Sequence, residues 1–153
     1  MPSASFVAIH DTSETEAAPD IAPTFAVVLA RGPAGVVLVF NRYRRVWELP
    51  GGFIDPGESA RDAARRELAE EAHCDAGSLD WLGIVEVDDG QRRCGAVFSC
   101  VVASVPAQVS NAEIDGIASW MPGVAPQPLG QTDRALLEIL SARLARTGPP
   151  KTG

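Results

Sequence analysis

The sequence lacks the features that mark a secreted or membrane-embedded chain. Its three cysteines, Cys74, Cys94 and Cys100, form neither a CxxC pair nor a disulfide framework, so we expect reduced thiols and a cytoplasmic location. The N-terminus has no basic region followed by an apolar run, so we expect no signal peptide. No apolar stretch approaches the roughly 20 residues that span a bilayer, so we expect no membrane partner.

Positive charge is also scarce. The chain carries 13 lysines and arginines against 20 acidic residues, a net charge of -7, and Lys151 is its only lysine. A nucleic-acid polymer is therefore not expected as the main partner, because affinity for such polymers comes largely from cationic contacts with phosphate. A small phosphorylated substrate remains compatible with this charge, because a bound metal ion can neutralise phosphate locally.

The remaining composition is that of one globular domain. With 153 residues, of which 46% are hydrophobic, the chain is long enough to bury a core. We expect a flexible or partly ordered lead-in over residues 1–22, a single domain over residues 23–146 and a frayed tail over residues 147–153. The sequence shows no internal repeat and no second domain.

Short β-branched runs bounded by turn residues predict strands, and apolar residues at helical spacing predict a C-terminal helix. The expected strands are Ser5–Ile9, Thr24–Ala30, Val36–Phe40, Val46–Leu49, Leu79–Val87, Ala96–Val105 and Ala118–Met121. The expected helices run from Ser59, as N-cap, to about Ala72, and from Thr132, as a candidate N-cap, to Leu144. Mixed strands with one central and one terminal helix predict an α/β sandwich.

The most informative segment runs from Gly52 to Cys74, where a Gly/Pro-rich loop leads into an acidic helix. Glu67, Glu70 and Glu71 stand at i, i+3 and i+4 and therefore share one helix face. Like charges at this spacing repel, so a cation is expected to offset them, and carboxylates favour Mg2+ or Mn2+. The alternative is an exposed acidic face paired with nearby arginines, namely Arg61, Arg65 and Arg66.

This segment resembles the Nudix box, the pattern Gly-x5-Glu-x7-Arg-Glu-U-x-Glu-Glu-x-Gly-U, in which U is a bulky aliphatic residue. The matching positions are Gly52, Glu58, Arg66, Glu67, Leu68, Glu70 and Glu71. Two late positions depart, because His73 replaces the final glycine and Cys74 the last aliphatic residue. The resemblance implies an α/β/α sandwich with a mixed central sheet. It also implies a Mg2+-dependent hydrolase that cleaves a diphosphate linkage with water.

The carboxylates Glu67, Glu70 and Glu71, with the Gly51 carbonyl, are the expected metal ligands, and Glu67 and Glu70 are also expected to be catalytic. The resemblance implies that Arg66 orients the catalytic glutamate. Some relatives take their general base from the box and others from a later loop. In the later loop Glu113 and Asp115 are candidates, and we favour Glu113 by its position before the following strand. The alternative is an ordinary solvated acid.

The basic cluster before the box is a candidate for substrate binding, because arginine forks match phosphate and carboxylate groups. The expected substrate-binding residues are Arg42, Arg44, Arg45, Glu48, Gly52 and Glu58. As alternatives, the arginines form plain surface, and Glu58 is a favourable charge at the helix N-terminus.

The family resemblance leaves the substrate open. Compact single-domain members often act on nucleoside triphosphates, including oxidised ones, which favours a triphosphate here. Members that act on ADP-ribose often carry a proline about sixteen residues after the box, where this chain has Asp88–Gln91. ADP-ribose and nucleotide sugars remain the alternative substrates. A catalytically silent module that senses a nucleotide is the alternative of another class. Relatives often form dimers, although no exposed apolar stripe requires one here.

Overall fold

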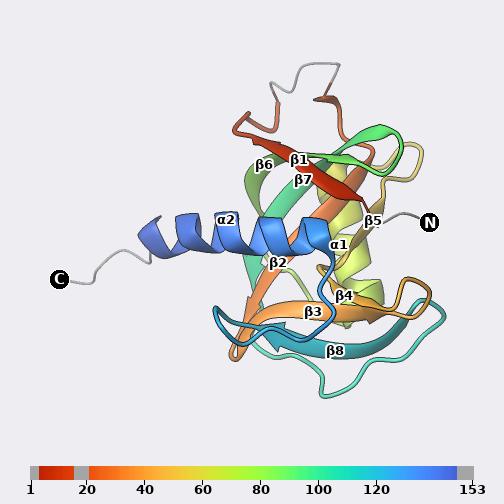
Figure 1. The fold of residues 1–153 in the computed structure, drawn as a ribbon, viewed down its shortest axis with the longest axis vertical. Helices are drawn as coiled ribbons and strands as arrows, with labels where there is room; N and C mark the ends of the chain where they lie inside the picture. Colours follow the sequence, from red (N-terminus) through yellow and green to blue (C-terminus); the bar gives the residue numbers. More distant parts are fainter. Residues whose placement is uncertain (1–3, 16–20, 148–153) are drawn as a thin grey trace.

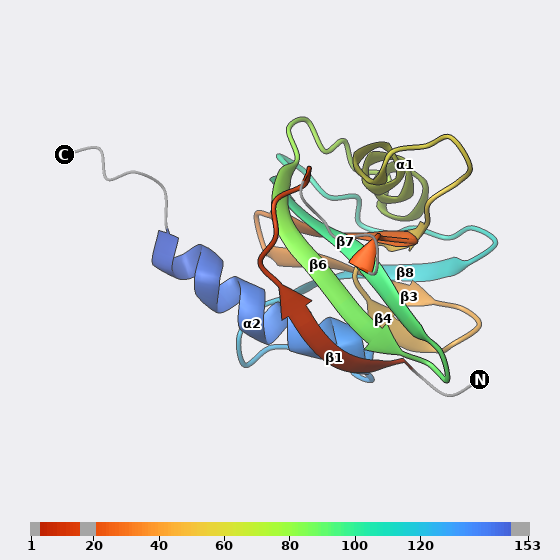
Figure 2. The ribbon, with the colours of Figure 1, turned by 90° about the horizontal axis from the view of Figure 1, so that it is seen from above.

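The computed structural model describes residues 4–15 and 21–147 as a mixed β-sheet between two helices (Figure 1). The strands are β1 (Ser5–His10), β2 (Phe25–Gly32), β3 (Gly35–Asn41), β4 (Val46–Glu48), β5 (Gly51–Phe53), β6 (Asp80–Asp88), β7 (Arg92–Val101) and β8 (Ile114–Trp120). The helices are α1 (Ala60–Ala72) and α2 (Gln131–Thr147). Seen from above, α1 and α2 lie on opposite sides of the sheet (Figure 2). The predicted α/β/α sandwich is confirmed.

Strand β2 is the centre of the sheet. The strand order is β1-β6-β7-β2-β3-β4, with β5 pairing to β2 and β8 to β3. The β2–β7 pair is parallel, whereas β2 pairs antiparallel with β3 and β5, so the sheet is mixed. In the β5 pairing Gly51 lies opposite Val27 and Gly52 opposite Ala26. The glycine-rich start of the box is thereby fixed to the most central strand.

Both faces of β2 are buried, which explains its continuous apolar sequence. Ala26 and Val28 belong to the core cluster under α1, and Val27 and Leu29 to the cluster under α2. Helix α1 contributes small residues and one leucine to its cluster: Ala63, Ala64, Leu68 and Ala72. Helix α2 contributes Leu136, Leu137 and Leu140 to the other. The small residues let α1 approach the sheet closely.

Both ends of α1 match the expected caps. The Ser59 hydroxyl accepts the Asp62 N–H at 3.0 Å, as an N-cap does. His73 adopts the left-handed conformation, with φ 54° and ψ 36°, at the position where the box has glycine. The His73 N–H donates to the Ala69 carbonyl at 3.1 Å. Histidine therefore terminates the helix where glycine would do so with less strain.

Three strand predictions need correction. Strand β7 begins at Arg92 and ends at Val101, earlier at both ends than expected, and β8 begins at Ile114 rather than Ala118. Strand β5 was not expected, because glycine has a low strand propensity. Pairing with β3 extends β8, and pairing with β2 creates β5, so non-local contacts override the local signal.

The predicted N-cap role of Thr132 was wrong. Helix α2 begins at Gln131, and the Thr132 hydroxyl donates to the Ala4 carbonyl at 3.2 Å. Residues 1–3, 16–20 and 148–153 lie outside the described residues, so the expected lead-in, domain and tail boundaries stay predictions. The strand expected near Ser5 is present as β1, paired with β6. No helix within the described ranges is long and apolar enough to cross a membrane.

Helix α2 is tied to the segment before β5 by Asp133. The Asp133 carboxylate accepts the Leu49 N–H at 2.9 Å, two residues before Gly51. Gly130 makes room for this carboxylate, because a Cβ there would collide with it. The Gly130 N–H donates to the Trp47 carbonyl at 2.9 Å, so the residues just before α2 pair with β4. Burial, followed by the charge of nearby Glu48, raises the pKa of Asp133 to about 7.

Asp133 is expected to make stability depend on pH. Its pKa is raised on folding from an ordinary value of 3.8, so the folded state holds this proton more tightly and stability falls between about pH 4 and pH 7. Asp133→Asn keeps an acceptor for the Leu49 N–H without the charge. Relative to wild type, its free energy of unfolding should rise by up to about 1 kcal/mol per pH unit over this range and level off above it. Glu138→Gln, on the exposed side of α2, is the control for charge. Equal pH profiles for the two variants would contradict the prediction.

Candidate active site

Two glutamates of α1 are buried against the β5 backbone. Glu67 is 8% exposed and Glu71 is 5% exposed, whereas the Glu70 side chain is 60% exposed. The Gly51 N–H donates to Glu71 Oε1 at 2.8 Å. A Cβ on Gly52 would overlap the Glu67 carboxylate, so any larger residue there would force this carboxylate out of its observed position. The three side chains differ in orientation: those of Glu67 and Glu71 face the loop, whereas that of Glu70 lies on the outer flank of the helix.

Arg66 joins the acids of the box. Its Nε and Nη2 donate to the two Glu58 oxygens at 2.8 and 2.9 Å, a bidentate pair. Its Nη1 donates to Glu67 at 2.9 Å and to Glu70 at 3.3 Å. Its Nη2 also donates to the Phe53 carbonyl at 3.1 Å, which ties the helix to the end of β5. The hydrogen bond from Arg66 lowers the pKa of Glu58 to about 2.

The two buried glutamates have different electrostatic surroundings. Burial raises the pKa of Glu71 to about 8, and the Gly51 N–H only partly opposes this effect. Burial also raises the pKa of Glu67, against the hydrogen bond from Arg66. The neighbouring protein groups therefore offset the charged form of Glu71 poorly, and a divalent cation would stabilise that form.

The donor set fits a hard cation, although the side chains have not converged on one. Within residues 4–15 and 21–147, no three acidic, histidine or cysteine side chains meet closely enough to hold a metal ion. The Arg66 guanidinium donates hydrogen bonds to the carboxylates of Glu67 and Glu70, and the Glu71 carboxylate accepts the Gly51 N–H. The candidate ligands are all oxygen atoms on a rigid helix and a close-packed loop, as Mg2+ prefers. The metal assignment from the sequence stays a prediction.

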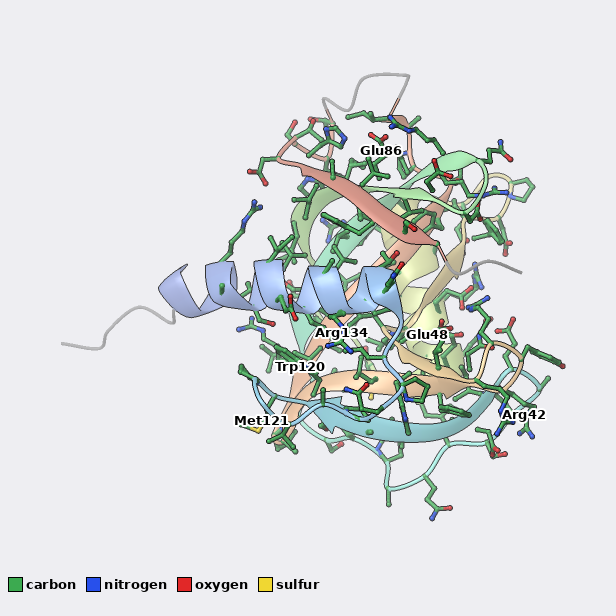
Figure 3. All side chains as sticks on the ribbon, viewed as in Figure 1. Arg42, Glu48, Glu86, Trp120, Met121 and Arg134 are labelled. Atoms are coloured by element: carbon green, nitrogen blue, oxygen red, sulfur yellow. The ribbon has the colours of Figure 1, made fainter. Side chains whose placement is uncertain are left out.

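Arg42 lies against the loop that precedes β8. Its Nη2 donates to the Ser110 hydroxyl at 3.2 Å and to the Asn111 carbonyl at 3.1 Å, and it lies 3.5 Å from Asp115. Figure 3 shows Arg42 at the outer edge of the molecule, beyond the end of β3. Arg42 therefore braces a loop in this structure, and a role in substrate binding remains a prediction.

The other arginines of the cluster also have partners. Arg44 forms a fork with Glu48 through contacts of 2.7 and 3.2 Å, and Glu48 also accepts the Asn41 side-chain N–H at 2.9 Å. The Arg45 guanidinium lies 6.0 Å from the centre of the Phe40 ring. A substrate anion would therefore compete with existing contacts at Arg44.

The loop before β8 reaches α1. The Asn111 side-chain N–H donates to the Glu70 carbonyl at 3.2 Å, and the Glu113 N–H donates to the Asn111 side-chain oxygen at 3.0 Å. Glu113 itself is exposed. After burial and the larger contributions, the charge of Glu113 also raises the pKa of Glu67 and of Glu71, so its carboxylate is within electrostatic reach of both acids.

Sequence reasoning missed three residues that shape this region: Asn41, Asn111 and Asp133. Asn41 is 4% exposed and binds Glu48, Asn111 links the later loop to α1, and Asp133 holds the Leu49 N–H. Asn111 had a weak local signal, because asparagine commonly accepts backbone N–H groups two or three residues on. Asn41 had the same signal, since it accepts the Tyr43 and Arg44 N–H groups, whereas the contact of Asp133 joins segments that no local pattern connects.

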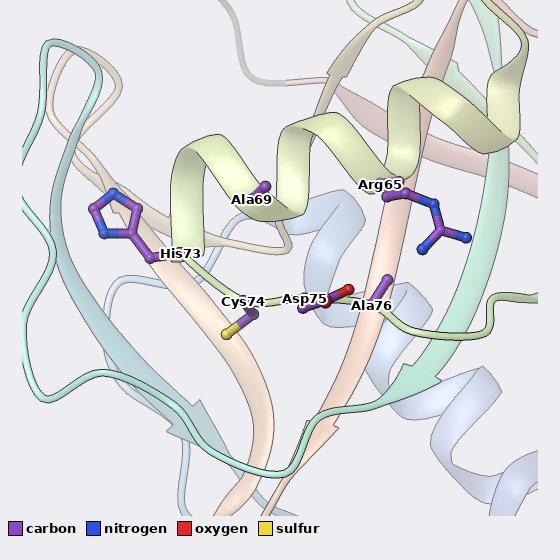
Figure 4. Close-up of a pocket in the computed structure, with 6 residues that line it drawn as sticks. All are labelled: Arg65, Ala69, His73, Cys74, Asp75 and Ala76. Carbon is purple, nitrogen blue, oxygen red and sulfur yellow. The ribbon is translucent and has the colours of Figure 1, made fainter.

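A surface cavity of about 410 Å³ lies beside the C-terminal half of α1, away from these acids. It is lined by Arg65, Ala69, His73, Cys74, Asp75 and Ala76 (Figure 4). In the close-up, the Arg65 and His73 side chains lie at opposite ends of the group. None of the acids of the box lines it, so we assign it no part in the candidate chemistry.

Comparison with known proteins identifies the class. The NUDIX domain family model matches residues 20–137. A Bacillus subtilis protein named as an 8-oxo-dGTP diphosphatase is 31% identical over 102 residues, which cover 67% of each chain. A mutator protein, MutT4, of Mycobacterium tuberculosis is 32% identical over 120 residues, which cover 72% of this chain but 48% of that protein. The chain therefore spans about half the length of the second relative.

Solved structures share the fold. The Bacillus subtilis pyrophosphohydrolase BsRppH has a TM-score of 0.71 at 21% identity, covering 92% of this chain and 90% of that one. The NUDIX domain of Shewanella oneidensis NrtR, solved with ADP-ribose, has a TM-score of 0.69 at 22% identity, covering 84% and 94%. The chain belongs to the Nudix hydrolase family and is a pyrophosphohydrolase of that family, as the box predicted. Enzymes of this family generally use divalent metal ions.

Gly52→Ala should separate activity from stability. The new Cβ would push the flexible Glu67 carboxylate from its place, so hydrolysis should fall by about 100-fold or more while the melting temperature changes little. Gly77→Ala is the opposite control. That site is spatially open but has φ 59°, so it should lose about 1 kcal/mol of stability and keep its activity. Hydrolysis rates and melting temperatures are measured for both variants. Normal hydrolysis by Gly52→Ala would contradict the prediction that activity needs the Glu67 carboxylate in its observed position.

Proposed function

We propose that this protein is a Mg2+-dependent pyrophosphohydrolase that acts on a nucleoside triphosphate. The main observation behind the proposal is that two buried carboxylates, Glu67 and Glu71, pack on the Gly51–Gly52 backbone. The Arg66 guanidinium lies beside them and bonds to Glu67. A rigid acid cluster of this kind suits hydrolysis of a phosphoanhydride, whose oxygens otherwise repel a nucleophile.

The proposed metal ligands are Glu67, Glu70, Glu71 and the Gly51 carbonyl. When bound, the cation would neutralise the diphosphate and lower the pKa of a water molecule. Arg66 orients the acids through its contacts with Glu67 and Glu70. In this proposal exposed Glu70 joins the ligand set by a change of rotamer that breaks its 3.3 Å contact with Arg66.

Glu113 is the proposed general base. It takes a proton from water as the water oxygen bonds to phosphorus, and the P–O bond of the anhydride breaks to release the phosphate leaving group. Its support is its position: it directly precedes β8, in a loop joined to α1. Arg42, Arg44 and Arg45, with Glu48, Gly52 and Glu58 nearby, are the proposed surroundings of the substrate.

The names of the curated relatives support a nucleoside triphosphate, because one is named as an 8-oxo-dGTP diphosphatase and the other as a mutator protein MutT4. ADP-ribose or a nucleotide sugar is the second candidate. The NrtR domain solved with ADP-ribose supports it through fold alone. A silent sensor is less well supported, because every acid of the box is present.

A substrate panel with millimolar Mg2+ tests the proposal. It contains canonical and oxidised deoxynucleoside triphosphates, ADP-ribose, nucleotide sugars and dinucleoside polyphosphates, with phosphate and pyrophosphate as readouts. Turnover of triphosphates that EDTA abolishes and Mg2+ or Mn2+ restores is the expected result. Turnover of ADP-ribose alone would select the second candidate. No turnover, combined with a ligand that raises the melting temperature, would select the sensor.

Glu71→Gln and Glu70→Gln should each lower metal-dependent hydrolysis by more than about 100-fold, because each removes a ligand charge. Glutamine at position 71 still accepts the Gly51 N–H, so the fold should persist with an unchanged circular dichroism spectrum. Glu138→Gln, with the same loss of charge on exposed α2, should keep wild-type activity. Full activity in both box variants would exclude the metal assignment.

A further inference from the structure

The end of α1 leaves the Glu70 backbone carbonyl available to another part of the chain. In a continuing helix the Glu70 carbonyl would accept the N–H four residues on, which is that of Cys74. Here left-handed His73 turns the chain back, and the Cys74 N–H is directed to the Leu68 carbonyl at 3.5 Å. The Asn111 side-chain N–H donates to the Glu70 carbonyl instead, at 3.2 Å.

The same Asn111 side chain organises the loop that carries Glu113. Its oxygen accepts the N–H groups of Glu113 at 3.0 Å and Ile114 at 2.8 Å. The Asn111 backbone N–H donates to the Ile114 carbonyl at 2.8 Å, which closes the turn at the start of β8. One amide group therefore bonds to both α1 and the Glu113 turn, using its donor for the helix and its acceptor for the loop.

Strand β3 holds this turn from the other side. The Arg42 N–H donates to the Glu113 carbonyl at 2.7 Å, while the Arg42 side chain contacts Ser110 and Asn111. The Glu113 backbone is thereby fixed between β3 and Asn111. Among the side-chain hydrogen bonds of the described residues, the one from Asn111 extends this frame to α1, because it reaches the carbonyl of Glu70, whose side chain belongs to the acid cluster.

We propose that Asn111 is a positioning residue that holds the Glu113 carboxylate in place over the acidic face of α1. This inference rests on the proposed function, with Glu113 as the base. An exposed acid on a loop has no fixed distance from the reacting water, and errors of about 1 Å can lower a rate by about 100-fold. The Asn111 link removes that freedom because it bonds to the helix that carries the proposed metal ligands.

A double-mutant cycle tests the coupling. Glu113→Gln and Asn111→Ala are measured singly and together for kcat, KM and the Mg2+ concentration that gives half-maximal activity. We expect Asn111→Ala to lower kcat by about 10- to 100-fold, with KM and the Mg2+ requirement within about twofold of wild type. The double variant should be no slower than Glu113→Gln, because Asn111 acts through Glu113. Losses that multiply in the double variant would overturn the proposal.

Two further variants guard against a general structural effect. Asp88→Ala removes a similar side-chain bond, to the Gly90 N–H at 2.9 Å in the distant β6–β7 turn, and should leave kcat unchanged. Asn111→Asp keeps the acceptor oxygen for the Glu113 turn but loses the donor to Glu70, and it serves if Asn111→Ala does not fold. A slow Asn111→Asp enzyme with a wild-type melting temperature supports the link to α1, and normal kcat contradicts it.

The outcomes separate the two proposals. Normal kcat in Glu113→Gln, with Glu71→Gln inactive, would remove both the base assignment and the positioning role while leaving the metal site intact. A slow Glu113→Gln enzyme with normal Asn111 variants would remove the positioning role alone. Activity in Glu70→Gln and Glu71→Gln would overturn the proposed metal site itself.

Discussion

The candidate site depends on holding two carboxylates largely out of water. Transfer of an ionised carboxylate from water into a protein costs several kcal/mol unless other groups offset the charge. Glu67 is offset by the Arg66 guanidinium, whereas Glu71 receives the Gly51 N–H, and burial raises its pKa to about 8. The fold thus tolerates an electrostatic cost at a single point, which a divalent cation would relieve.

The residues around the two glutamates allow α1 to lie close to the β5 backbone. A glutamate side chain is short, so the helix axis and the β5 backbone must lie near each other for Glu67 and Glu71 to touch the loop. The Ala63–Ala64 pair brings α1 onto the sheet, and Gly52 removes the side chain that would meet Glu67. Small residues on α1 and glycine on β5 both shorten the distance between the helix and the strand.

Local signals were sufficient for the parts of the fold that depend on neighbours in sequence. The box helix, its Ser59 cap and the left-handed His73 all follow from residues within one or two turns of one another. Strand β5 and the first half of β8 did not, because glycines disfavour strands and only pairing with β2 and β3 orders them. Thr132 was misassigned because its hydroxyl bonds to Ala4, at the far end of the sequence.

In the candidate site, too, local contacts could be predicted from the sequence and long-range contacts could not. Fixed spacing on one helix predicted that Glu67, Glu70 and Glu71 share a face, but it could not show that Glu70 points outward or that Arg66 is bonded to two of the acids. The contacts of Asn111 with Glu70 and of Asp133 with Leu49 span 41 and 84 positions, beyond any local pattern.

The residues proposed to bind the substrate, in the basic loop of Arg42–Arg45, lie outside the box that carries the proposed chemistry. Arg44 is already paired with Glu48, and Arg42 with the loop before β8. The pair of Arg42 and Asp115 is exposed on both sides and contributes under about 1 kcal/mol, so a multiply charged phosphate can displace it at little cost. Because Arg42 also braces the Asn111 turn, a substrate that recruits its guanidinium would loosen the side-chain contacts of the Glu113 loop while leaving the Arg42 N–H bond in place. If Arg42 binds substrate as proposed, substrate binding and the position of the proposed base would be coupled through one arginine, outside the box that defines the family.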